Sequence, residues 1–411
     1  MLQACLAATV RHPLAGFLAF FLIAAFFIPS QPAWAMLFYL VGLPLTLARL
    51  NRDPELDWRS PQVILSGLLI VWSLLTMTWG WHESPKAART FGEILAAICT
   101  GAFFLGLLVS LDDEPRMADA LCWIFIIYGA TNAAIAFAMN FAIYRTDFQR
   151  FDGWAITRHQ ILGSMIFGQC YLFALDRSLR EPRWRLWTAL AGAVCLAFII
   201  MTGSRGPLAA AIIASAFLLI GLTKRSGLLL LVAPVFCAIV AGLVMWFRPG
   251  LFRAVADQLW GRGASYRPQI WSFTLNRVAE HLWIGHGPAA ELGMPRIRAG
   301  LEAYSFPHSF YLSALFYGGV VGLVLLLAVL GFTSVKLLGN AIRTGSPIVL
   351  ALWVNVLIGG LTDLGQVADG PVHIWLIFWV PLTLASSRIL DDDRRAKSQF
   401  PAGAFGGVGS R

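Results

Sequence analysis

Long unbroken runs of apolar residues recur along almost the whole sequence. A helix needs about 20 largely apolar residues to cross a bilayer, and we read twelve segments as such helices. The strands of a membrane β-barrel would instead alternate apolar and polar residues. The pattern therefore predicts an all-α polytopic membrane protein with about 12 transmembrane helices. The expected helices cover residues 14–28, 34–49, 61–79, 93–111, 119–142, 160–176, 186–203, 206–223, 227–247, 308–335, 346–363 and 371–388.

The composition supports this fold class. Of the 411 residues, 58% are hydrophobic and 13% are charged, whereas soluble domains carry about 25% charged residues. A soluble enzyme, a disordered chain and a nucleic-acid-binding module are thereby excluded. The six cysteines fall in or beside apolar runs without a CxxC spacing, which argues against a disulfide framework and against a zinc site. The segment 14–28 is interpreted as the first helix and not as a cleavable signal peptide.

The basic residues predict the orientation. With the N-terminus in the cytoplasm, 18 of the 31 Lys and Arg residues lie on the cytoplasmic side. Seven of the other 13 belong to the long segment 248–307, and the positive-inside rule discounts long loops. Both termini are therefore expected in the cytoplasm, and the net charge of +9 reflects orientation or anionic lipid. Residues 1–390 are expected to form a single transmembrane domain, and residues 391–411 a disordered cytoplasmic tail.

A large, partly helical segment, residues 248–307, is expected on the outer face between the ninth and tenth helices. Its pattern predicts helices at about 251–260 and 268–283, a Gly-rich turn at 285–288 and a further helix near 289–302. Its tryptophans suit a segment lying on the membrane surface. We expect this segment to cap a cavity.

Arg205 is the sharpest candidate for chemistry. Two apolar runs meet at residues 202–207, Thr-Gly-Ser-Arg-Gly-Pro, with almost no loop between them. Pro207 suits the first turn of a helix, and a helix N-terminus beside an Arg can bind an anion. The alternative is an Arg that snorkels to the interface and anchors the hairpin. The local pattern does not separate these two interpretations.

Other candidates lie on the same outer face. Arg267 precedes a predicted helix and could face the same point as Arg205, although a solvated loop Arg fits the local pattern as well. His308 opens the tenth helix and could act as a general base, or could cap the helix. Arg158 would by default contact lipid headgroups, and His286 would by default be a turn residue.

Several kinds of catalytic site are missing from the sequence. No outer-face group of Asp and Glu has metal-site spacing, and neither a Walker loop nor a G-x-S-x-G elbow occurs. No metal and no cofactor is therefore expected. Arginines can hold a pyrophosphate and stabilise it as it leaves, and a lipid pyrophosphate that carries a sugar brings its own activated bond. The enzyme would then position an acceptor hydroxyl and remove its proton.

Four short motifs in order, on one membrane face, carry a resemblance. They are Gly203-Ser204-Arg205-Gly206-Pro207-Leu208, Ser265-Tyr266-Arg267 with Trp271, Trp283-Ile284-Gly285-His286-Gly287-Pro288 and Pro307-His308-Ser309-Phe310-Tyr311-Leu312. With the long outer segment, they resemble the bacterial O-antigen ligase and polymerase superfamily. The resemblance implies a glycosyltransferase-C-like fold in the bacterial inner membrane. It also implies metal-independent, inverting transfer of a glycan from undecaprenyl pyrophosphate to a sugar hydroxyl of lipid A–core at the periplasmic face.

The resemblance also implies roles for individual residues. Arg205 and Arg267 would bind the donor pyrophosphate, with Arg158 as a third candidate, and His308 would activate or position the acceptor hydroxyl. Three secondary candidates are His286, Tyr266 and Ser309. The family often has His-Asn where this chain has His308-Ser309, which puts a hydrogen-bonding role of that second residue in doubt.

Three other functions remain open on the sequence. O-antigen polymerases and protein O-oligosaccharyltransferases of the same superfamily share the donor and the fold. The oligosaccharyltransferases tend to have longer outer segments or appended domains, which this chain lacks. A transporter of lipid-linked glycans belongs to another class, and would tend to show internal repeats and interrupted helices at the bilayer midplane. The O-antigen ligase is the preferred interpretation, because the polar residues gather at one face.

Overall fold

The protein is a bundle of helices. The computed structural model describes residues 12–52, 56–80, 87–114, 116–143, 150–222, 266–295 and 304–388. Within these ranges the one extended pairing is a bridge between Met294 and Tyr304. The elements are α2 (Pro13–Ala25), α3 (Gln31–Leu37), η1 (Phe38–Gly42), α4 (Leu43–Leu50), α5 (Pro61–Gly80), α6 (Ala87–Asp113), α7 (Arg116–Ile143), η3 (Ala155–Thr157), α8 (Gln160–Arg180), α9 (Arg185–Met201), α10 (Arg205–Leu222), α13 (Arg267–Val278), η5 (Ala279–His281), α14 (Phe310–Thr344), α15 (Ile348–Thr362), η6 (Trp375–Trp379) and α16 (Val380–Ser386).

The described helices confirm a polytopic, all-helical membrane protein. Six of them are long and apolar enough to cross a membrane, and four shorter ones are also apolar. Each predicted range except 227–247, which lies outside the described residues, coincides with a helix. The total of twelve crossings stays a prediction. The six long candidates are Gln31–Leu50, Pro61–Gly80, Arg89–Asp113, Arg116–Ala142, Arg205–Leu222 and Phe310–Thr344.

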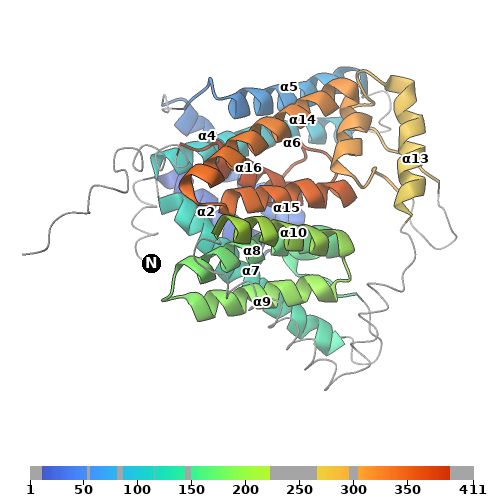
Figure 1. Ribbon diagram of the computed structural model, residues 1–411. Coiled ribbons are helices and arrows are strands. Elements are labelled where there is room, and N and C mark those ends of the chain that lie inside the picture. Colours follow the sequence, from blue (N-terminus) through green and yellow to red (C-terminus); the bar gives the residue numbers. More distant parts are fainter. Residues whose placement is uncertain are drawn as a thin grey trace, which may run out of the picture.

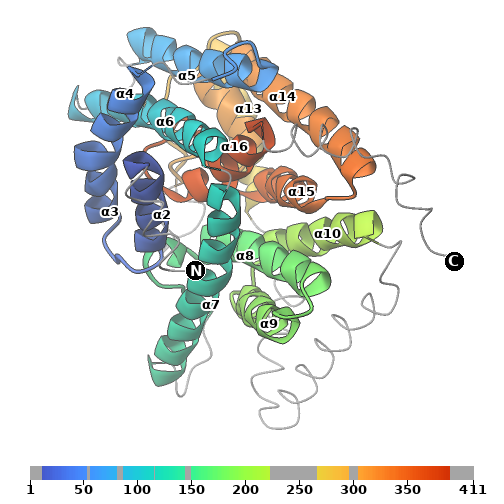
Figure 2. The same ribbon diagram turned by 90° about the vertical axis from the view of Figure 1, so that its left-hand side faces the viewer.

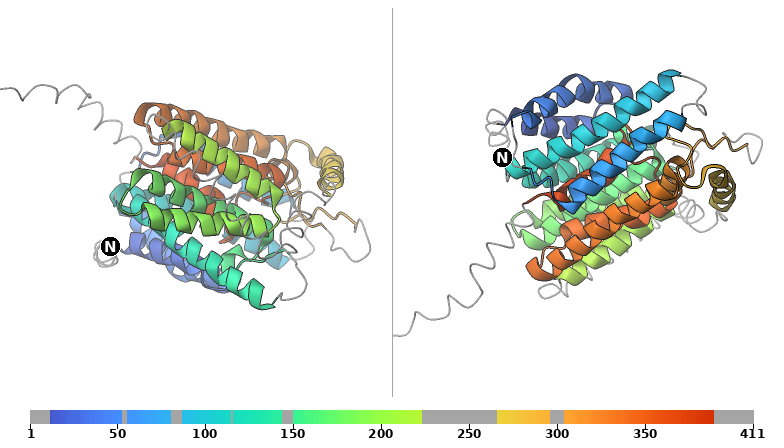
Figure 3. Two further views of the ribbon diagram at one scale, coloured as in Figure 1. Left: turned by 60° about the horizontal axis from the view of Figure 1, so that its bottom comes forward. Right: turned by 90° about the horizontal axis from the view of Figure 1, so that it is seen from above.

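Most of the long helices run along a common direction, side by side, and α13 is the exception. Figure 1 shows α13 standing across one end of α14, α15 and α10, and the two views of Figure 3 show the same end from other sides. The core between the helices is aromatic. The Trp375 ring stacks on Phe103 with 4.3 Å between centroids, and Trp34 stacks on Phe21 at 4.5 Å. Such close packing fixes the helices relative to one another.

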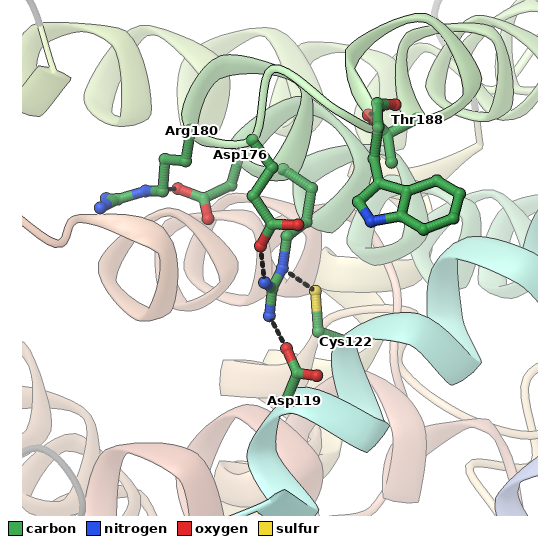
Figure 4. A network of polar contacts seen from close by, with 8 residues as sticks. Asp119, Cys122, Asp176, Arg180 and Thr188 are labelled. Carbon is green, nitrogen blue, oxygen red and sulfur yellow. Dashed lines mark hydrogen bonds and ion pairs between the residues drawn. The ribbon is translucent and has the colours of Figure 1, made fainter. Parts of the chain in front are cut away.

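Helix α8 connects two groups of polar residues at opposite ends of the bundle. Its 21 residues span about 30 Å, the thickness of the hydrocarbon core. His159 caps its first turn, where Nδ1 accepts a hydrogen bond from the Leu162 N–H at 3.2 Å. At its last turn, Arg177 pairs with Asp119 of α7 and donates to the Cys122 sulfur at 3.2 Å (Figure 4). The end of the bundle that holds Arg177 is therefore the one opposite His159.

Helix α14 is broken at Gly319, and the loop at 282–287 docks into the break. Gly319 has φ 65° and ψ −166°, a conformation that essentially only glycine adopts. The loop supplies partners for the backbone groups that the break releases. The Val320 N–H donates to the Leu282 carbonyl and the His286 N–H donates to the Phe316 carbonyl, each at 2.9 Å. The Gly-rich motif is thus a structural joint that holds the outer segment on α14.

We expect Gly319→Ala to destabilise the protein strongly. A Cβ at this position would lie 2.5 Å from the Ile284 nitrogen, and the strained backbone alone costs about 1–3 kcal/mol. Gly331→Ala is the matched control, because that glycine lies in the same helix with open space around its Cβ position. The thermal unfolding midpoint of the purified protein should fall by several degrees for Gly319→Ala and stay level or rise for Gly331→Ala. Equal thermal unfolding midpoints for the two variants would contradict the role of Gly319 in holding the outer segment on α14.

The structure confirms part of what the sequence predicts for the outer segment. The predicted helix at 268–283 is present as α13, continued by the 3₁₀ turn η5, and the turn at 285–288 is confirmed by positive φ at Gly285 and Gly287. The predicted helix near 289–302 is wrong for residues 289–295, which are not helical. Their backbone pairs with the segment before α14 instead, since the Leu292 N–H donates to the Ser305 carbonyl at 3.1 Å. The expected helices at 251–260 and 227–247, and the tail 391–411, lie outside the described residues.

Candidate functional site

Arg205 begins helix α10 directly after a tight turn. Gly203 has φ 63°, which lets the chain reverse between α9 and α10. Arg150 fixes this turn from outside, because its Nε donates to the Thr202 carbonyl at 2.6 Å and its Nη2 donates to the Ser204 hydroxyl at 3.0 Å. The Arg205 side chain is exposed. It is thus held at the end of the bundle beside the first N–H groups of α10, in a place suited to an anion.

Arg267 is brought to the same place by α13. It is the first residue of that helix, and α13 lies across the end of the bundle (Figure 1). Burial lowers the pKa of the Arg267 guanidinium, nearby Asp363 raises it, and the positive charge of Arg205 lowers it again. Two arginines and one carboxylate are therefore close enough to interact electrostatically. An anion between the two guanidinium groups would relieve their mutual repulsion.

His308 faces a buried carboxylate. Its Nδ1 lies 3.4 Å from Oδ1 of Asp363, which is fully buried at the end of α15. Asp363 Oδ1 also accepts the Leu364 N–H at 3.0 Å, and Oδ2 has no hydrogen-bond partner among the described residues. The His308 backbone has φ 52°, and its ring lies against Phe306 with 3.9 Å between centroids. The imidazole is thus held in one orientation with a negative charge beside it.

The end of α10 is fitted closely to the end of α15. A Cβ added to Gly206 would collide with the Thr362 hydroxyl, so only glycine permits this approach. Thr362 is the last residue of α15 and directly precedes Asp363. The close packing therefore places Arg205 near the carboxylate that faces His308.

The secondary candidates have structural surroundings. His286 is 1% exposed, its Nε2 lies 2.8 Å from the Arg277 carbonyl and its ring stacks on Phe316 at 4.7 Å. Tyr266 precedes α13 and packs on the small apolar cluster beneath that helix. Ser309 is the buried N-cap residue of α14 and makes no side-chain capping bond. Of these three residues, Ser309 is the one that directly follows His308 in the sequence.

Arg158 lies at a cavity. The cavity has a volume of about 720 Å³ and is also lined by Arg150, His159 and His373. Burial lowers the pKa of His159; Asp363 opposes this shift, and the neighbouring charge of His308 adds to it. His159 thus lines the cavity and is close enough to His308 and Asp363 to interact with them electrostatically. The structure brings Arg158 to this cavity, whereas it brings Arg205 and Arg267 to Asp363.

Sequence reasoning missed Asp363, His159 and Arg150 as site residues. Asp363 stands at the outer end of a nearly uncharged helix, and a carboxylate there is a signal in itself, because ionisable groups at membrane depth are costly. The sequence could not predict that His308 is the partner of this carboxylate, because the two residues meet only when α14 packs beside α15. His159 and Arg150 carried no comparable signal, since charged residues near helix ends are ordinary.

Comparison with known proteins agrees with the motifs. A family model described as O-antigen ligase matches residues 188–327, a range that includes Arg205, Arg267 and His308. The chain is also 25% identical over 380 residues to a protein of Pseudomonas aeruginosa named O-antigen ligase, which covers 90% of this chain and 88% of that protein. The resemblance seen in the motifs is thereby confirmed: the chain is a multi-pass membrane protein that is similar to the O-antigen ligase family.

Proposed function

We propose that this protein is an O-antigen ligase. It transfers a glycan from undecaprenyl pyrophosphate to a sugar hydroxyl of lipid A–core, with inversion and without a metal ion. The observation that carries the proposal is the convergence of Arg205, Arg267, His308 and Asp363 at one end of the bundle. The similarity over 90% of the chain to a protein named O-antigen ligase favours the ligase over the polymerase and the oligosaccharyltransferase.

The two arginines hold the donor. Guanidinium groups bind phosphate oxygens through paired hydrogen bonds, and Arg205 and Arg267 are close enough to interact electrostatically. As the bond between the anomeric carbon and the pyrophosphate breaks, negative charge grows on the leaving oxygen. Fixed cations at that point stabilise the transition state more than the ground state.

His308 is the general base for the acceptor hydroxyl. Its ring takes the proton of the acceptor hydroxyl while that oxygen forms a bond to the anomeric carbon. The electron pair of the broken bond leaves with the lipid pyrophosphate, and attack from the opposite side inverts the anomeric configuration. Asp363 faces the ring and stabilises the positive charge that develops on it.

The protein would lie in the bacterial inner membrane as a single transmembrane domain, residues 1–390, with twelve crossings. The site would face the periplasm and both termini the cytoplasm. Arg177 and Arg180 are at the end of α8 opposite His159, where the positive-inside rule places the cytoplasm. The substrates would reach the site within the membrane, because both carry lipid.

A reconstituted transfer assay tests this function. Purified protein is mixed with undecaprenyl-pyrophosphate glycan and lipid A–core, and the products are separated on a gel. Glycan on lipid A–core is the expected result. Longer glycan that remains on the carrier lipid would instead identify a polymerase. Folded protein that forms neither product would overturn the proposal and direct attention to transport of the lipid-linked glycan.

EDTA should leave the transfer rate unchanged. The described residues contain no group of three or more His, Cys, Asp or Glu side chains that could hold a metal ion, and the arginines supply the positive charge that a metal would otherwise provide. The rate is measured with and without EDTA, and again after a divalent cation is added in excess. Inhibition that the cation reverses would contradict the metal-independent mechanism.

A further inference from the structure

The cavity beside His159 has two chemically different walls. Its volume of about 720 Å³ lies within the range of small-molecule binding sites. One wall includes the polar residues Arg150, Asp152, Arg158 and Gln160. The other is formed by residues of and around the loop between α2 and α3, which are mostly apolar apart from Ser30 and Gln31. Such a pairing suits a saccharide, which presents hydroxyl and anionic groups at its edge and carbon–hydrogen faces above and below.

The cavity adjoins the turn that precedes Arg205, because its lining residues Arg150 and Gln160 are hydrogen-bonded to Ser204. Figure 2 shows α2 and α3 on one side of the bundle and α10 on the other, with α8 between them. His159, at the start of α8, interacts electrostatically with both His308 and Asp363. The cavity thus adjoins the site, with His159 and the turn before Arg205 at its edge.

The polar wall is prepared for a charged ligand. Arg158 is exposed, and its guanidinium makes no hydrogen bond or ion pair with the residues that the structure describes. Arg150 is oriented by its bonds to the turn before Arg205. The Gln160 amide donates to Asp152 Oδ1 at 2.8 Å, which fixes a carboxylate that can accept hydrogen bonds from sugar hydroxyls. His159 Nδ1 is used by the Leu162 N–H, so Nε2 carries the proton of the neutral ring and is a donor.

We propose that this cavity binds the acceptor, an anionic saccharide, with Arg158 paired to its phosphate or carboxylate and its reacting hydroxyl presented to His308. This rests on the proposed function. It assigns Arg158 to the acceptor, and the donor pyrophosphate to Arg205 and Arg267 alone. Adjoining sites for donor and acceptor let both substrates be bound at once, as direct transfer requires.

Steady-state kinetics of Arg158→Gln test the proposal in the reconstituted assay. Lipid A–core is varied at saturating undecaprenyl-pyrophosphate glycan, and then the glycan donor at saturating acceptor. We expect the acceptor KM to rise about tenfold, which corresponds to about 1.4 kcal/mol, while the donor KM stays unchanged. Arg277→Gln is the matched control, because Arg277 lies in the outer segment, pairs with Glu280 and does not line the cavity. This control should leave both constants unchanged.

A second acceptor separates charge pairing from other effects. With an acceptor whose phosphates are removed and whose carboxylates are esterified, wild type and Arg158→Gln should have the same acceptor KM. A rise in the donor KM would overturn the proposal and place the donor in the cavity. An unchanged acceptor KM, or the same tenfold rise with the neutral acceptor, would also overturn it. Failure of the wild type to transfer glycan at all would instead overturn the proposed function.

Discussion

His308→Ala is expected to lower kcat for glycan transfer by about 10²- to 10⁴-fold, the usual contribution of a general base. The donor should still bind, because its pyrophosphate is held by Arg205 and Arg267. The His308 ring is 21% exposed and anchored mainly by aromatic contacts, so truncation should leave the fold intact. Single-turnover rates and donor binding are measured separately on the same purified variant.

Asp363→Asn tests the contribution of the carboxylate beside His308. The substitution keeps the volume of a fully buried side chain and removes the negative charge beside His308, so kcat should fall while donor binding persists. Ser305→Ala is the control in the same loop, because Ser305 is exposed and accepts the Leu292 N–H through its backbone carbonyl, which the substitution keeps. Equal loss of transfer and donor binding in His308→Ala would show a structural histidine and contradict its role as a base.

Arg205→Ala is expected to reduce transfer by at least about 10²-fold, the usual effect of removing one donor to a developing anion, with normal amounts of protein in the membrane. Truncation of this exposed side chain should leave the fold intact, because the turn before it is fixed by the bonds of Arg150. The same assay measures both kcat and the donor KM.

Arg205→Lys separates charge from geometry. Lysine keeps the positive charge but cannot form the paired bonds of a guanidinium, so its activity should lie between those of wild type and Arg205→Ala. Arg277→Gln again serves as the control, since it removes an arginine of the outer segment that faces Glu280. Full activity of Arg205→Ala would remove Arg205 from the donor site and reduce it to an anchor of the hairpin.

The outer segment shows which local elements the sequence could predict and which it could not. The pattern predicted a helix that begins near Arg267 and a turn at Gly285, and both are present. It also predicted a helix near 289–302. The backbone at 289–295 pairs instead with the segment before α14, a contact between positions too far apart for a local pattern to report.

The motif at Gly285 and His286 shows a second limit. In the sequence this motif resembled a further part of the site, and its histidine was a candidate for a chemical role. The structure places the ring of His286 in a small core, 1% exposed, while the backbone around it fills the break at Gly319. Whether a histidine meets substrate or packs against Phe316 depends on which helix end lies beside it.

The sequence alone determined the fold class, the apolar helices and the candidate cations, because each follows from local composition. Apolar length sets the helices, and a charge between two apolar runs is expected at a membrane surface. The tertiary structure decided which polar groups meet. The pairing of His308 with Asp363 requires α14 to pack beside α15, and the approach of Arg205 requires Gly206 to fit against Thr362. Such pairings are set by close packing between distant segments, on which periodicity and spacing carry no information.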